Sequence, residues 1–192
     1  MTLAIASIQK DHQRFNALLH CFDRVVADGE EGKAVSLDLL HTMIDYIDSF
    51  LDRFHHPKED EYLFRVLRGR KPEMEPVLNQ MREDHYQGRR QLERVRAAVE
   101  AYDTEGKAAL PGLRAALDDY IELERKHIGV EEREILPQAR AALTHEDWVE
   151  INEAFGANRD PLFSDSRQRK FELLFNTIEH RAPPPFGRGE AA

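Results

Sequence analysis

The stretch LHTMIDYIDSFLDRFHHPKEDEYLFRV, residues 40–66, decides the fold. Its apolar residues recur every three or four positions, which is the period of an amphipathic α-helix. His55 and Glu59 occupy two positions of the same helix face, because residues four apart lie on one side of a helix. The sequence therefore places an imidazole and a carboxylate on a face that we expect to be buried. The complete face is Leu40, Ile44, Ile47, Leu51, His55, Glu59, Tyr62 and Val66.

A proline interrupts this helix between the histidine and the glutamate. Pro57 has no backbone N–H, and the ring of a proline clashes with the carbonyl group one turn earlier in a helix. We therefore expect a kink near Arg53, beside the buried pair.

Three further segments carry a histidine in place of an apolar residue on an otherwise apolar face. His12 fills the gap in a helix that begins near Ile5 and ends in the segment DGEEG, residues 28–32. His85 lies on a helix that begins near Pro76, and His127 on one that covers residues 110–135. Glu131 follows His127 by four residues, so the spacing of His55 and Glu59 occurs twice.

Length and composition favour one helical domain with a small addition. The chain has 192 residues, of which 41% are hydrophobic, 33% are charged and only 10 are glycine. We predict an all-α fold, a four-helix bundle with a short C-terminal helical appendage. The expected divisions are a bundle at residues 1–142, helices packed on it at residues 143–181, and an extended tail at residues 182–192, where PPP stops the last helix.

Charge and hydropathy exclude several classes of partner. A net charge of −9 argues against nucleic acid and against anionic membranes, since both are bound through basic patches. No apolar run has the roughly 18–20 residues of a membrane span, and the N-terminus lacks the features of a signal peptide. A single cysteine, Cys21, fits a reducing compartment. We therefore expect a cytoplasmic protein; the sequence identifies no protein partner.

The chemistry that joins these residues is metal binding. One histidine on an apolar face is usually a hydrogen-bonded core residue, but here four helices carry one in register, and two add a glutamate. A buried carboxylate costs several kcal/mol unless a cation compensates it. Four imidazoles and two bridging carboxylates, with a bridging oxo or hydroxo group, could hold two ions and leave a position open for a small molecule. Non-heme iron suits these donors best, and zinc, manganese or cobalt would also accept them.

Several residues near this set are expected to support it rather than bind metal. His56 lies about 100° around the helix from His55, so we expect it in the surrounding shell or facing solvent, with a role as substitute ligand as the alternative. The His56→Ala variant should accordingly retain most of the metal. Glu132 is expected on a solvated face. Gly88 would allow a close helix contact or room beside a metal. The possible members of the surrounding shell are His56, Tyr62, Gly88, Tyr120 and Glu124.

These motifs resemble the hemerythrin-like, or HHE cation-binding, domain proteins of bacteria. The similar segments are DH at residues 11–12, FHHPKE at 54–59, EDH at 83–85, and HIGVEE at 127–132 followed by ILP at 135–137. The resemblance covers about residues 5–140, and residues 160–185 are similar to the tail of stand-alone members. It implies an up-down-up-down bundle with a di-iron centre. The implied ligands are His12, His55, His85 and His127, with Glu59 and Glu131 as bridges.

One departure bears on function. Oxygen-carrying members of the family use a fifth histidine one turn after the histidine of the third helix, where this chain has Arg89. We therefore expect a di-iron protein that binds oxygen or nitric oxide for sensing or scavenging. The alternatives are an oxidoreductase-like activity on peroxide or nitric oxide, and iron storage or the binding of another metal. The sequence assigns no catalytic residue and leaves open whether the protein is an enzyme.

Overall fold

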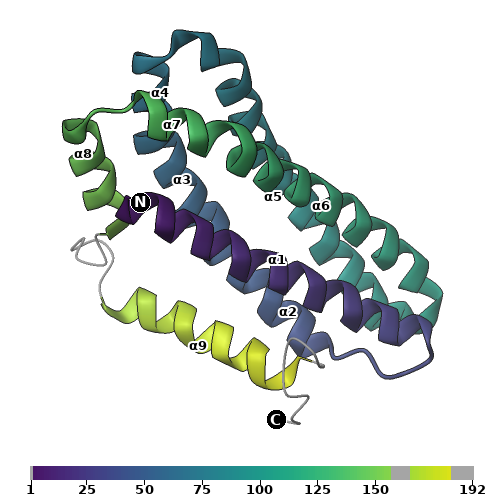
Figure 1. The fold of residues 1–192 in the computed structure, drawn as a ribbon. Helices are drawn as coiled ribbons and strands as arrows, with labels where there is room; N and C mark the ends of the chain where they lie inside the picture. Colours follow the sequence, from purple (N-terminus) through teal and green to yellow (C-terminus); the bar gives the residue numbers. More distant parts are fainter. Residues whose placement is uncertain (1, 157–164, 183–192) are drawn as a thin grey trace.

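The computed structural model describes residues 2–156 and 165–182, with the side chains of the second range from residue 173 onward. Every regular element in these ranges is helical, which confirms the predicted all-α class. The long helices lie side by side, and α9 lies outside them (Figure 1). None of the helices in the described ranges has both the length and the apolar character that a bilayer span requires. Apart from Ala182, the predicted tail lies outside the described residues.

The first two helical segments form one side of the bundle. Helix α1 covers Leu3–Glu30 and begins at Thr2, whose hydroxyl accepts a hydrogen bond from the backbone N–H of Ile5 at 3.3 Å. It ends within the segment that the sequence predicted. The second segment runs without a break through α2 (Leu37–Tyr46), η1 (Ile47–His55), α3 (His56–Lys58), η2 (Glu59–Phe64) and α4 (Arg65–Arg70).

The second segment departs from α-helix in an informative way. Elements η1 and η2 are π-helical, a conformation that is rare and concentrated at functional sites. They lie on either side of the turn that holds Pro57, which has no N–H to donate to the helix. Arg53, where we expected the proline to distort the helix, lies inside η1.

The third and fourth segments pack extensively on each other and on the first two. Their elements are η3 (Pro72–Met74), α5 (Glu75–Glu105), η4 (Gly106–Ala109), α6 (Leu110–Val130), η5 (Glu131–Ile135) and α7 (Leu136–Ala142). Helix α5 also contacts α2, and α6 contacts α1. Element η5 is again π-helical and begins at Glu131, so each π-helical stretch in the described ranges adjoins a His-x-x-x-Glu pair.

Two more helices pack on this bundle. Helix α8 (His145–Gly156) contacts α1 and η2, and the side chain of Asn152 accepts a hydrogen bond from the backbone N–H of Ala4 at 2.9 Å. Helix α9 (Asp165–Arg181) contacts α2, where the ring of Phe175 lies 5.7 Å from that of Tyr46.

The core consists of two apolar clusters with a polar band between them. The cluster that includes Ile178 of α9, here the α9-side cluster, also contains Phe15, Leu19, Phe22, Ile44 and Leu117. The cluster that includes Trp148 and Ile151 of α8, here the α8-side cluster, also contains Ile5, Ile8, Leu63, Leu78 and Ile135. The buried polar residues in the described part of the chain are His12, Asp52, His55, His56, Glu59, His85, Glu124, His127 and Glu131.

Candidate metal centre

The first group of candidate ligands lies between α1 and the second segment. One ligand atom from each of His12, His55 and Glu59 lies within 4.8 Å of the others. Nε2 of His55 lies 3.0 Å from Oε1 of Glu59, and Nε2 of His12 lies 3.9 Å from the same oxygen. The predicted pair of residues 55 and 59 therefore does face one point, and His12 joins it from α1.

The second group lies between the second segment, α5 and α6. It contains His56, Glu59, His85 and His127, whose ligand atoms also lie within 4.8 Å of one another. Nε2 of His85 lies 3.2 Å from Nε2 of His127 and 3.6 Å from Oε2 of Glu59. The two oxygens of Glu59 thus point to different groups.

Glu131 connects the same two groups from the other side. Its Oε2 lies 3.0 Å from Nε2 of His12 in the first group and 3.7 Å from Nε2 of His127 in the second. Glu59 and Glu131 are each 0% exposed. Each of the two carboxylates therefore approaches histidines of both groups.

The donor set fits divalent cations. Both oxygens of Glu59 and both of Glu131 are buried without a hydrogen-bond partner. Burying a carboxylate costs free energy unless a cation or hydrogen bonds compensate its charge. The imidazole nitrogens beside these carboxylates are donors that could hold such a cation. Imidazole and carboxylate without thiolate is a donor set for iron, zinc or manganese. The residues present are those that such ions would bind.

Each histidine of the two groups has a carboxylate beside its other ring nitrogen. The Nδ1 contacts are His12 to Glu132 at 2.9 Å, His55 to Asp11 at 3.4 Å, His56 to Asp52 at 3.4 Å, His85 to Asp60 at 3.3 Å and His127 to Asp84 at 3.9 Å. Carboxylates in this place fix the orientation of a ligating imidazole and raise its basicity. The arrangement directs Nε2 of these rings toward the centre.

Charges in the centre are strongly coupled. Burial opposes protonation of His12, but the neighbouring carboxylates of Glu131 and Glu132 raise its pKa to about 9. Burial likewise opposes protonation of His127, and the charge of Glu131 raises its pKa to about 9. Burial works against ionisation of Glu131, yet His127 and His12 lower its pKa to about 2. The metal-free centre therefore holds imidazolium–carboxylate pairs, from which a metal would displace protons.

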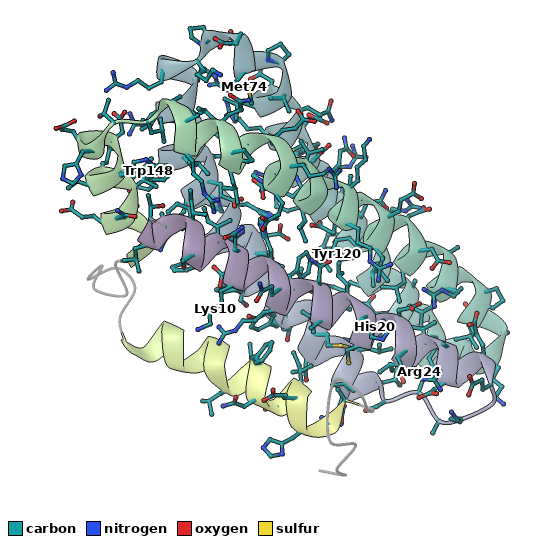
Figure 2. The ribbon with its side chains drawn as sticks, in the orientation of Figure 1. Lys10, His20, Arg24, Met74, Tyr120 and Trp148 are labelled. Atoms are coloured by element: carbon teal, nitrogen blue, oxygen red, sulfur yellow. The ribbon has the colours of Figure 1, made fainter. Side chains whose placement is uncertain are left out.

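A second set of buried acids lies beside the second group. Burial and the nearby charge of Glu124 raise the pKa of Asp52 to about 8, and burial raises the pKa of Glu124 to about 7, against the attraction of His127. A Cβ atom on Gly88 would lie 2.6 Å from Oε1 of Glu124, so the glycine leaves room for this carboxylate. Tyr120 is a buried residue of α6, at a place where α6 runs beside α1 (Figure 2).

Two expectations about individual residues are corrected. His56 does not face solvent, because it is 3% exposed and its ring stacks on that of His85 at 4.1 Å. Glu132 does not belong to a purely solvated face, because it accepts a hydrogen bond from His12. Tyr62 is half-buried and packs against the α8-side cluster.

The sequence reasoning missed the carboxylates beside the histidines. Most of them are chain neighbours of a candidate ligand on their own helix but contact a histidine of another helix: Asp11 precedes His12, Asp84 precedes His85, Asp60 follows Glu59 and Glu132 follows Glu131. An acidic residue directly beside four of the six candidate ligands was the available signal. Asp52, four residues before His56 on the same helix, is the exception.

The chain was compared with known proteins. The profile of the hemerythrin HHE cation binding domain matches residues 3–139. Searches of curated proteins and of solved structures gave no match. The matched range contains every histidine and glutamate of the two groups described above. The chain therefore belongs to the hemerythrin HHE cation-binding domain family.

Proposed function

We propose that this chain is a non-heme di-iron binding protein built on an up-down-up-down four-helix bundle, with α8 and α9 as a C-terminal appendage. The observation that carries the proposal is the position of Glu59 and Glu131, each of which reaches both histidine groups with oxygens that lack hydrogen-bond partners. The proposed ligands of the two ions are His12, His55, Glu59, His85, His127 and Glu131. The family match supports metal binding, for which iron is the proposed ion.

We propose further that the centre takes up oxygen or nitric oxide for sensing or scavenging. Iron held by imidazole and carboxylate supplies a redox-active ion with an exchangeable position. Apolar rings lie against the histidines of the centre: Phe64 stacks on His85 with ring centroids 5.9 Å apart, and the ring of Phe50 lies 6.1 Å from that of His55. Apolar surroundings of this kind favour a small neutral ligand over a charged one.

The position of Arg89 supports sensing or scavenging over reversible oxygen carriage. Arg89 is exposed, and its charge favours the ionised form of Asp52. Arginine offers no metal ligand there, because its guanidinium has five N–H donors and no acceptor.

The test begins with the metal-free chain reconstituted with ferrous iron under anaerobic conditions. We expect two iron ions per chain by elemental analysis, and an optical change when oxygen or nitric oxide is added to the reduced protein. A chain that binds two iron ions but responds to neither gas would overturn the proposed ligand. Zinc-only or empty protein after native expression would overturn the choice of iron.

A second candidate function rests on the buried acids. Asp52 and Glu124 have pKa values of about 8 and 7, so both can hold and release protons near neutral pH beside the second group. Proton supply of this kind favours turnover of peroxide or nitric oxide. Consumption of more than one equivalent of oxidant per centre would identify an oxidoreductase, and its loss in Glu124→Gln would assign the proton donor. Stoichiometric uptake alone would favour binding, and accumulation of iron far beyond two ions would favour storage.

A further inference from the structure

We infer that His56 is a fifth imidazole ligand, bound to the same ion as His85 and His127 and held in place by Asp52. The inference rests on the proposed dinuclear centre and changes its composition. It gives the first group two imidazoles and the second group three, with Glu59 and Glu131 shared.

The first support is the location of His56. The side chain is buried, and one of its ring nitrogens lies within 4.8 Å of donor atoms of Glu59, His85 and His127. Its ring is nearly parallel to that of His85, with an interplanar angle of 11°, and meets that of His127 edge-on at 5.5 Å. Three imidazoles therefore lie close to the carboxylate of Glu59. Three nitrogen donors and one oxygen donor are enough to bind a metal ion.

The second support is the carboxylate beside Nδ1 of His56. Oδ1 of Asp52 lies 3.4 Å from Nδ1 of His56, the same distance as that from Asp11 to His55. The other four histidines of the two groups also have a carboxylate beside Nδ1. With Nδ1 turned to the carboxylate, Nε2 of His56 is directed into the second group. Asp52 would act as a positioning residue.

His56 and His55 point in different directions from the same helix, and both directions lead into the centre. Adjacent residues diverge by about 100° around a helix. The second segment contacts both α1 and α5. His55 is directed to the α1 side, where it meets Asp11, and His56 to the α5 side, where it meets His85. His55 therefore belongs to the first group and His56 to the second, although they are adjacent in the chain.

The test counts the ligating imidazoles directly, with cobalt(II) alone as the probe. Cobalt is added to the full-length metal-free chain, and proton NMR spectra are compared in H₂O and D₂O. Each bound imidazole that keeps its Nδ1–H gives one strongly shifted signal that disappears in D₂O. We expect five such signals in the unmodified chain, one for each histidine with a carboxylate at Nδ1.

Two variants and a control complete the experiment. His56→Phe keeps an aromatic ring against His85, so we expect a folded chain with four shifted signals and at least about tenfold weaker binding of one cobalt ion. Asp52→Asn should keep five signals but move one of them. His20→Phe changes an exposed histidine and should leave all five unchanged.

The outcomes separate the two proposals. Two cobalt ions with only four shifted signals in the unmodified chain would overturn the assignment of His56 and leave the dinuclear centre intact. An unchanged spectrum and affinity in folded His56→Phe would do the same. A chain that takes up no cobalt and no iron would overturn both proposals. If His56→Phe does not fold, the signal count of the unmodified chain still decides.

Discussion

The apolar clusters and the polar band use the same helix faces but differ in whether their atoms have partners. Along α1, Ile8 belongs to the α8-side cluster, His12 to the metal centre and Phe15 to the α9-side cluster. The apolar residues pack against one another, whereas the oxygens of Glu59 and Glu131 face imidazole nitrogens of several helices. We infer that the apolar clusters maintain the fold and that the polar band between them serves the proposed metal centre.

The largest expected effect comes from removing the oxygen pair that both groups share. Glu59→Gln replaces a charged donor by a weaker neutral one, and we expect loss of both ions after reconstitution with iron, measured by elemental analysis. Glu61→Gln is the matched control, because Glu61 lies two residues away and is exposed. Retention of two ions by Glu59→Gln would contradict the bridging role.

The second prediction concerns a residue of an apolar cluster rather than of the metal centre. Phe22 is 0% exposed in the α9-side cluster, and Phe22→Ala should lower the free energy of unfolding by about 3–5 kcal/mol, because it leaves a cavity. Urea denaturation of the metal-free chain measures this loss. The folded variant should still bind two ions.

The control for this variant is Leu173→Ala on α9. Leu173 is 66% exposed, so its truncation should change the free energy of unfolding by less than about 0.5 kcal/mol. Loss of metal from folded Phe22→Ala would show that the apolar cluster and the centre are not separable.

The fold and the candidate ligands were accessible from sequence for the same reason. A period of three to four residues identifies a helix and its buried face, and a histidine in register on that face is visible without coordinates. His12, His55, His85 and His127 were found in this way. The structure brings all four together with Glu59 and Glu131.

The rest depends on how the helices are placed around one another. The orientation of His56 follows from the presence of α5 on one side of the second segment, which no local pattern encodes. Asp11, Asp60, Asp84 and Glu132 act on histidines of other helices, so their role appears only after packing. The π-helical stretches had a sequence signal only near Pro57.

Without metal, the free energy of unfolding should depend on pH through the histidines of the centre. A ligand at 100 times its dissociation constant stabilises a fold by about 2.7 kcal/mol. In the metal-free chain, His12 and His127 have pKa values raised to about 9. Their ion pairs therefore stabilise this form fully below about pH 6.5, and that contribution is lost as the pH rises through about 9.

The loaded chain should not share this loss, because its histidines are already neutral. We expect the gap in unfolding free energy between loaded and metal-free chains to widen from pH 6.5 to pH 9. We also expect protons to be released on metal binding at pH 7 but hardly at pH 10, as measured with an indicator dye. Metal uptake at pH 7 without proton release would show that the imidazolium–carboxylate pairs are absent in solution.

The smallest expected effect tests whether the end of the bundle can be weakened without touching the centre. At the start of α8, the hydroxyl of Thr144 accepts a hydrogen bond from the backbone N–H of Asp147 at 3.3 Å, and Oδ2 of Asp147 accepts one from the N–H of Thr144 at 2.8 Å. Thr144→Ala should lower the free energy of unfolding by about 1 kcal/mol in urea denaturation, with two ions retained.

The carboxylate of Asp147 titrates, so the stability that it contributes at the start of α8 depends on pH. Hydrogen bonds from Arg70 lower the pKa of Asp147 from 3.8 to about 2. The contribution of the carboxylate is therefore present above about pH 4 and lost as the pH falls toward 2, far from the range in which the centre titrates. Thr144→Ser keeps the hydroxyl and should retain most of the stability at pH 7. If Thr144→Ser lowered the free energy of unfolding as much as Thr144→Ala, the loss would come from the methyl group of Thr144. Apolar packing, rather than the cap, would then hold α8.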